Sequence, residues 1–221
     1  MTLPGRFKQR EARPAVFARQ NGALPERGLV LAQRRGGGYA ASVWAGAVAV
    51  KTILDERGMA ETLAGLADQI AASVPRDGRL AVVGIRNRGE VLGDRLIRLL
   101  EDRGFDPIDR GVLDITLYRD DLAEKGPDAV VRSTEIDFDL NDCTLVLVDD
   151  VLWTGRSARA ALDALVDLGR PQAVRLAVLV DRPGRELPIQ ADFVGVRTQH
   201  ADQHVNVMVA ETDGQDRVEV G

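Results

Sequence analysis

Cysteine is almost absent from this chain, since Cys143 is the only one among 221 residues. A single cysteine excludes an intramolecular disulfide, so we expect a reducing, cytoplasmic compartment. The sequence also lacks any apolar run near the ~20 residues that a membrane-spanning helix needs. No compact apolar stretch stands ahead of small residues near the start, so no secretory signal is predicted. We therefore expect no membrane partner.

Histidine is nearly as scarce as cysteine. His200 and His204 have a spacing that metal sites use, but no cluster of carboxylates or thiolates accompanies them. We expect both to be solvated loop residues rather than metal ligands.

Apolar and charged residues are present in the proportions of a globular protein. They make up 45% and 29% of the chain, which excludes a collagen-like or fully disordered chain. The charge is uneven, because residues 1–46 carry eight basic and two acidic side chains. That segment therefore has a net charge of +6, which leaves −11 for the rest of a chain whose total is −5. An acidic body is a poor general partner for nucleic acid.

The first 46 residues also differ from the rest in pattern. Proline and glycine are scattered through them, and no helical or alternating period persists. A basic tail of this kind is either a nucleic-acid-binding arm or a disordered extension, and we favour the extension. Translation from a misplaced start would also produce it. The predicted division is an extension at 1–46 and a folded domain at 47–221.

Apolar runs alternate with amphipathic stretches in the second part of the chain. Asp55 is placed to cap a helix whose apolar face includes Leu63, Leu66 and Ile70. The other predicted elements are strands at 80–85, 112–117, 145–148, 174–180 and 192–196 and helices around 92–100 and 158–165. Strands that alternate with helices predict an α/β fold, with a mostly parallel sheet flanked by helices on both faces.

The most informative segment is 145–157, with the sequence LVLVDDVLWTGRS. An apolar strand leads to two acids, and a turn with one glycine and two hydroxyl groups then opens a helix. Backbone N–H groups at a helix N-terminus bind phosphate, whereas adjacent carboxylates suit sugar hydroxyls or a divalent cation. Either half alone is common in turns and helix caps. Together they predict a site for ribose 5-phosphate.

This segment resembles the signature for phosphoribosyl pyrophosphate (PRPP) in type I phosphoribosyltransferases. Four further stretches restrict the resemblance to one family of these enzymes: 114–122, 162–171, 176–182 and 185–189. From about Thr52 to its end the sequence is similar to the PyrR family, whose members regulate pyrimidine operons and are uracil phosphoribosyltransferases. The resemblance implies the type I phosphoribosyltransferase fold with a small hood, and a homo-oligomer.

The resemblance also implies a reaction of uracil with PRPP that gives UMP and diphosphate in the presence of Mg²⁺. The residues it assigns to the chemistry are Arg86, Arg88, Arg119, Asp149 and Asp150. The two aspartates would bind the ribose hydroxyls and could contribute to a Mg²⁺ site, with the ion held largely by PRPP. The other binding positions are Asn87 in the diphosphate loop, Val151, Leu152, Trp153, Thr154, Gly155, Arg156 and Ser157 around the 5-phosphate, and Asp181, Arg182, Phe193 and Val194 near the base.

Several positions depart from the family pattern. Ala64, Gly65 and Asp68 stand where the first helix of the family has a Thr-Arg pair and a histidine. Gln190 and Val196 stand in place of an arginine and a lysine. Losing basic residues removes phosphate contacts that support RNA binding. Trp153 replaces a tyrosine or phenylalanine, and we expect it to pack under the loop.

Three interpretations follow. The leading one is a uracil phosphoribosyltransferase, which would also regulate pyrimidine genes if RNA binding is retained. The alternative is an attenuator that binds pyrimidine-operon mRNA, uses UMP and PRPP as effectors and has little catalytic activity. A third is an α/β protein that binds a nucleotide without catalysis.

Overall fold

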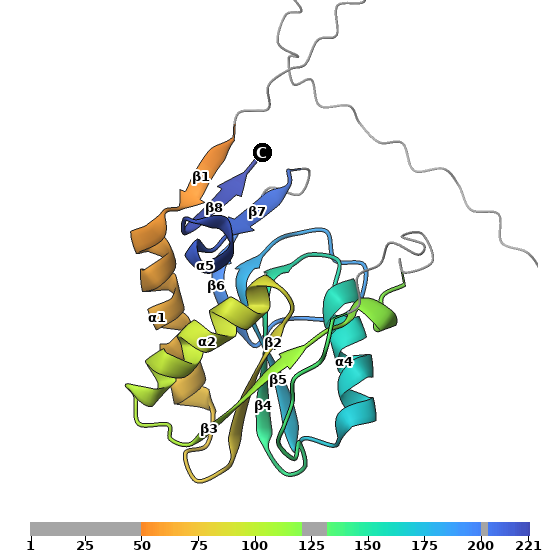
Figure 1. Cartoon of the computed structure of the whole chain (residues 1–221). Helices are drawn as coiled ribbons and strands as arrows, with labels where there is room; N and C mark the ends of the chain where they lie inside the picture. The colour runs from red at the N-terminus through yellow and green to blue at the C-terminus, as the bar shows by residue number, and fades with distance from the viewer. Residues whose placement is uncertain (1–49, 121–131, 200–202) are drawn as a thin grey trace, which may run out of the picture. The chain divides into compact units, whose positions relative to one another are not determined.

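A computed structural model describes residues 50–120, 132–199 and 203–221 (Figure 1). By its contacts the chain divides into two units, Met1–Ala45 and Gly46–Gly221, and all described residues belong to the second. The predicted extension at 1–46 therefore lies outside the described residues. Within the described ranges, no helix has the length and apolar character needed to cross a membrane.

A five-stranded parallel sheet forms the centre of the domain. Its strands lie in the order β3 (Ile108–Leu113), β2 (Leu80–Ile85), β4 (Thr144–Leu152), β5 (Ala173–Asp181) and β6 (Phe193–Arg197). All six residues of β2 are buried, as its continuously apolar sequence predicts. The predicted α/β fold with a mostly parallel sheet is confirmed.

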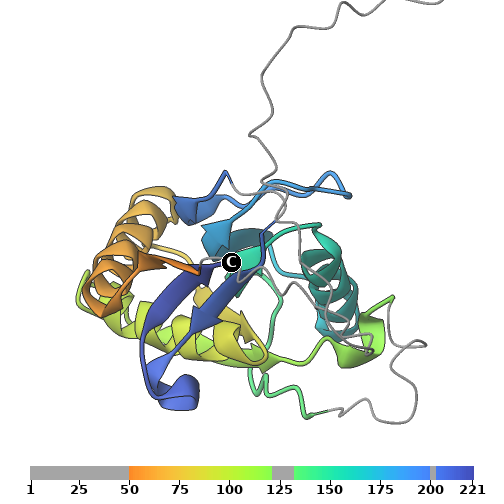
Figure 2. The same ribbon diagram turned by 90° about the horizontal axis from the view of Figure 1, so that it is seen from above.

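Three longer helices cover the two faces of this sheet. The helices α1 (Glu56–Ser73) and α2 (Arg88–Glu101) pack on one face, and α4 (Arg156–Leu168) packs on the other (Figures 1 and 2). Because strand side chains alternate between faces, each face has its own apolar core. Val146 and Val148 belong to the core under α1 and α2, whereas Leu145 and Leu147 belong to the core under α4.

The start of α1 follows the sequence prediction. Asp55 accepts a hydrogen bond from the Gly58 N–H at 2.8 Å, and the predicted apolar face with Leu63, Leu66 and Ile70 is buried. The capping carboxylate satisfies one of the backbone donors that a helix N-terminus leaves without an intrahelical partner.

Replacing Asp55 with alanine is expected to destabilise the domain by about 1 kcal/mol, because this cap is lost. For a domain of this size the melting temperature should fall by about 2–4 °C. Differential scanning calorimetry measures the change. Asp77→Ala, at an exposed position beyond the end of α1, is the control, and an equal shift in both variants would contradict the capping role.

One predicted strand is displaced in the structure. The strand expected at 112–117 is instead β3 at Ile108–Leu113, and Thr116–Tyr118 forms a 3₁₀ turn, η1. The cause is Asp114, whose carboxylate accepts hydrogen bonds from the Thr116 N–H at 3.0 Å and from the Thr116 hydroxyl at 2.6 Å. Such local side-chain bonds favour a turn over continuation of the strand.

A small antiparallel sheet lies beyond one end of the central sheet (Figure 1). It has the order β1 (Lys51–Leu54), β8 (Arg217–Val220) and β7 (Val205–Met208), and the short helix α5 (Ala210–Asp213) joins β7 to β8. We call these elements the hood. Phe193 and Val194, which the resemblance places near the base, do not belong to the hood, because β6 pairs with β5 as the edge strand of the central sheet.

Candidate active site

Two adjoining cavities, of about 510 and 310 Å³, lie where the parallel strands end. The residues that line both of them are Arg88, Arg119, Asp149, Asp150, Val151 and Ser157. The acid pair of β4, the turn before α4 and the first residue of α2 therefore meet at one place. This is the edge at which parallel α/β sheets bind ligands.

Two glycines allow α2 to approach the sheet closely enough to bring Arg88 there. A Cβ atom on Gly84 of β2 would lie 2.4 Å from the carbonyl oxygen of Gly89, and one on Gly89 would lie 2.4 Å from the carbonyl oxygen of Val148. No larger residue fits at either position without moving backbone. The first turn of α2 is thus pressed against β2 and β4, next to the acid pair.

Asp149 and Asp150 lie half-buried inside β4, which extends past them to Leu152. Asp149 accepts a hydrogen bond from the Asp150 N–H at 3.0 Å, and Asp150 accepts one from the Val151 N–H at 2.8 Å. Burial, followed by the charge of Asp150, raises the pKa of Asp149 well above its ordinary value. Burial also raises the pKa of Asp150, against the effect of the Arg88 charge. Donor hydroxyls or a cation would stabilise the ionised pair.

Replacing Asp149 with asparagine is expected to raise the melting temperature by about 2–4 °C near neutral pH. Asparagine keeps the shape and can still accept the Asp150 N–H, but it carries no charge. Because the folded-state pKa of Asp149 is raised, the stability that this group contributes is present below its ordinary pKa and lost as the pH rises through the raised one.

The gain in melting temperature should therefore be larger near neutral pH than at about pH 4. At the lower pH the Asp149 carboxyl of the wild type is more protonated in both the folded and the unfolded protein. Thermal melts across this range measure it. A variant that melts below the wild type near neutral pH would contradict a cost of burying the charge.

The turn predicted to bind phosphate stands at the N-terminus of α4. Gly155 precedes the helix with φ at +93°, in the left-handed region that favours glycine. The Arg156 N–H donates a hydrogen bond to the Thr154 hydroxyl at 3.3 Å. Thr154, Gly155, Arg156 and Ser157 all line the larger cavity. The donor-rich end of α4 thus faces the space next to the acid pair.

The side chain of Arg156 is already engaged by acids. Its Nε donates to Glu186 at 2.8 Å, and its guanidinium also pairs with Asp120. These two carboxylates raise the pKa of Arg156. The backbone and hydroxyl groups of the turn are therefore the better candidates for phosphate donors. The sequence analysis did not identify either carboxylate.

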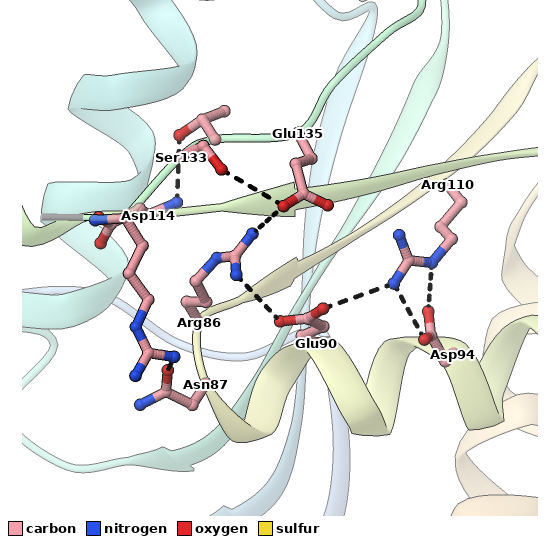
Figure 3. A network of polar contacts seen from close by, with 10 residues as sticks. Arg86, Asn87, Glu90, Asp94, Arg110, Asp114, Ser133 and Glu135 are labelled. Carbon is pink, nitrogen blue, oxygen red and sulfur yellow. Dashed lines mark hydrogen bonds and ion pairs between the residues drawn. The ribbon is translucent and has the colours of Figure 1, made fainter.

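The loop predicted to bind diphosphate is held by a second set of contacts (Figure 3). Arg86 donates to Glu135 at 2.6 Å and lies 3.7 Å from Glu90. Asn87 accepts a hydrogen bond from Arg132 at 2.6 Å. The Arg86 guanidinium lowers the pKa of Glu135. Arg86 and Asn87 line the smaller cavity, but the charge of Arg86 is balanced by acids.

Glu90 extends this network along α2. It also lies 3.6 Å from Arg110 of β3, which bonds both carboxylate oxygens of Asp94 at 2.6 and 3.0 Å (Figure 3). The network ties the loop after β2 to the neighbouring strand and to residues 132–135. It fixes the loop that closes the smaller cavity on one side.

Trp153 and Arg182 form a pair on the wall of the larger cavity. The Arg182 guanidinium lies 4.6 Å from the centre of the Trp153 ring, in a cation–π contact, and Arg182 is 6% exposed. Trp153 is 48% exposed, so the expectation that it packs under the loop is wrong. A Cβ atom on Gly184 would lie 2.5 Å from the indole nitrogen, so the ring packs directly against the backbone at Gly184.

Two predicted base-binding residues lie away from these cavities. Val194 is 8% exposed and packs in the core under α4, because its side chain faces inward from β6. Asp181 lies at the end of β5, where it binds Arg185 at 2.5 Å and approaches Arg197 to 3.6 Å, beside a separate hollow. Neither residue lines the two cavities that the acid pair lines.

The hood contributes residues that the sequence analysis missed. The larger cavity is lined by three residues of β7, Val205, Asn206 and Val207, and by His204, which precedes the strand. The alternation of valine with polar residues in 204–207 is a strand pattern that could have revealed this element. His204 is exposed, as expected, whereas His200 lies outside the described residues.

Comparisons with known proteins agree with this geometry. The family model for the phosphoribosyl transferase domain matches residues 49–213. Bifunctional protein PyrR of Deinococcus radiodurans is 48% identical over 170 residues, covering 76% of this chain and 93% of that protein. Bifunctional protein PyrR of Thermus thermophilus is 53% identical over 164 residues, covering 73% and 90%.

Solved structures are similar as well. The hypoxanthine phosphoribosyltransferase of Trypanosoma cruzi matches with a TM-score of 0.59 at 17% identity, covering 77% of this chain and 95% of that one. The hypoxanthine-guanine enzyme of Leishmania tarentolae, solved in complex with GMP, matches with a TM-score of 0.58 at 16% identity, covering 77% and 94%. At this identity the similarity shows the fold alone, and it agrees with the expected type I phosphoribosyltransferase fold.

Proposed function

This chain belongs to the PyrR family of phosphoribosyltransferases, and on that premise we propose that it transfers the phosphoribosyl group of PRPP to uracil, forming UMP and diphosphate. One observation carries the proposal. The acid pair Asp149–Asp150 and the donor-rich turn of α4 line a single cavity of about 510 Å³. A phosphorylated ribose has hydroxyls at one end and a phosphate at the other. One strand–turn–helix unit here offers carboxylate acceptors for the hydroxyls and N–H donors for the phosphate.

The proposed chemistry needs no covalent nucleophile. Breaking the anomeric bond of PRPP develops positive charge on the ribose, as in glycoside hydrolysis. Asp149 and Asp150 would accept hydrogen bonds from the ribose hydroxyls and oppose that charge. The backbone N–H groups and hydroxyls of 154–157 would hold the 5-phosphate, so the sugar is fixed at both ends.

Negative charge develops on the departing diphosphate. Arg88 and Arg119 line both cavities and would stabilise it. Arg86 would stabilise the diphosphate less strongly, because Glu135 and Glu90 already balance its charge. The smaller cavity, of about 310 Å³, is the proposed position of the leaving group.

The residues fit a magnesium ion that is bound together with the substrate. Within the described part of the chain, no group of three or more potential ligands could hold a metal by itself. Asp149 and Asp150 are oxygen ligands whose buried charges a cation would offset, and Mg²⁺ is usually bound by one or two carboxylates plus substrate phosphates. When bound, the ion would neutralise charge on the diphosphate.

The decisive test is an assay with PRPP, uracil and Mg²⁺ in which UMP is measured by chromatography. We expect UMP formation that depends on all three components. Hypoxanthine and guanine are the matched alternative bases, because the solved structures of the same fold include enzymes for those purines. Product from a purine but not from uracil would overturn the base assignment. No product from any base would favour the third interpretation, a protein that binds a nucleotide without catalysis.

Regulation through pyrimidine-operon mRNA is the second candidate function, because the relatives are named bifunctional. The surface of α1 argues for weaker RNA binding. Asp68 binds Arg103 at 2.7 Å, and Arg103 also donates to the Ala64 carbonyl, so an acid offsets a nearby cation. Titration of leader RNA over a salt series distinguishes a regulator from an enzyme that has lost RNA binding. Tight, sequence-selective binding with a steep salt dependence would favour the regulator, and weak, unselective binding would favour the enzyme alone.

We also propose a cytoplasmic homo-oligomer, on the family resemblance. Sedimentation velocity measures the mass in solution, and a monomer at all concentrations would overturn the second part of this proposal.

A further inference from the structure

Arg88 is bound by a residue of the hood that lies far away in the sequence. Its Nε and Nη2 donate to the two carboxylate oxygens of Asp213 at 3.3 and 3.1 Å. Asp213 is the last residue of α5, whereas Arg88 is the first residue of α2 and lines both cavities. We propose that Asp213 is a positioning residue that holds the Arg88 guanidinium where the diphosphate of PRPP binds. The proposal rests on the proposed function.

Asp213 is itself well fixed. Its Oδ2 accepts a hydrogen bond from the Val209 N–H at 2.9 Å, at the start of α5. This backbone bond, together with Arg88, lowers the pKa of Asp213. The carboxylate therefore stays ionised near neutral pH and has a fixed direction. A bidentate contact to such a group restricts both the position and the plane of the guanidinium.

Arg88 has a second acidic neighbour inside the site. Arg88 lines both cavities together with Asp149 and Asp150. The guanidinium is therefore held by a carboxylate of the hood at the cavities that the acid pair of β4 also lines. Without Asp213, the guanidinium would lose its fixed position beside the smaller cavity, where the diphosphate is proposed to bind. The expected effect of losing Asp213 is weaker binding of PRPP.

A neighbouring contact separates this role from simple attachment of the hood. Arg95 of α2 bonds Glu211 of α5 at 3.1 Å and Asp216 at 2.8 Å. The contact with Glu211 joins the same two helices, whereas Asp216 follows α5, and none of these three residues lines either cavity. Glu211→Gln therefore removes a carboxylate between α5 and α2 without touching Arg88. It is the matched control for Asp213→Asn.

The experiment compares wild type, Asp213→Asn and Glu211→Gln by steady-state kinetics and by equilibrium binding of UMP. Asparagine can still accept the Val209 N–H, so the fold should be retained. We expect Asp213→Asn to raise the KM for PRPP about tenfold. The KM for uracil and the affinity for UMP, which has no diphosphate, should stay near wild type. Glu211→Gln should change none of the three.

A double variant tests the route through Arg88. Arg88→Lys keeps the charge but cannot form the bidentate contact. In that background Asp213→Asn should add little, because the pair is already lost. A further tenfold rise in the KM for PRPP would show that Asp213 acts by another route and would overturn the proposal.

The remaining outcomes are also decisive. An unchanged KM for PRPP in an active Asp213→Asn variant overturns the positioning role. Equal weakening of PRPP, uracil and UMP, or the same change in Glu211→Gln, assigns the effect to a loosened hood and also overturns it. A wild-type chain that forms no UMP overturns the proposed function, and the inference falls with it.

Discussion

Replacing Asp150 with asparagine is expected to lower the turnover of PRPP and uracil by about 10²–10³-fold, with the fold intact. Asparagine has the same shape and can still accept the Val151 N–H that Asp150 accepts at 2.8 Å. It lacks the negative charge that would oppose the positive charge on the ribose in the transition state. Because Asp150 is half-buried, water cannot replace that charge effectively. The loss should appear in kcat more than in the KM for PRPP.

The matched control is Asp163→Asn on α4, which removes an exposed carboxylate that pairs with Arg159 at 3.0 Å. Exposed pairs of this kind contribute little, so activity and melting temperature should stay near wild type. The melting temperature of Asp150→Asn should not fall, since a buried charge is removed. Near-normal kcat in this variant would refute the assignment of the acid pair to the ribose.

Much of the central fold is predictable because its signals are local. The strand at Leu80–Ile85 is a continuous apolar run, and the strand at Ala173–Asp181 is apolar apart from Arg175 and Asp181. The cap of α1 lies next to the apolar face of that helix. The β3 boundary is harder, because one side chain, Asp114, turns the chain. The hood depends on pairing between β1 and β8, which lie at opposite ends of the domain. No short-range pattern specifies such a contact.

The candidate site divides in the same way. The acids and the turn of 145–157 lie in one continuous segment, so their proximity can be read from the sequence. The carboxylates that bind the arginines cannot, because Glu135 and Asp213 come from remote segments. The chain has 29 basic and 34 acidic residues, so very many pairings are compatible with the sequence. Only the packing of α2 against its neighbours selects among them.

Replacing Gly84 with alanine is expected to destabilise the domain by about 2–3 kcal/mol, because the added methyl group meets backbone. Its Cβ would lie 2.4 Å from the carbonyl oxygen of Gly89 and 2.5 Å from the Cα of Glu90. Neither atom can rotate away as a side chain could, so the first turn of α2 must move. The melting temperature should fall by about 4–12 °C in calorimetry.

Gly65→Ala is the control, because it makes the same substitution in the interior of α1, where nothing lies within 4 Å of the new Cβ. Alanine is favoured over glycine in a helix, so this variant should be more stable by about 0.5–1 kcal/mol. Opposite signs for the two variants would show that close packing, and not the loss of glycine itself, decides the result. Arg88 is the first residue of α2, and the first turn of α2 packs against Gly84. The Gly84 variant should therefore also bind PRPP more weakly. Destabilisation with unchanged PRPP binding would mean that Arg88 does not depend on this packing for its position.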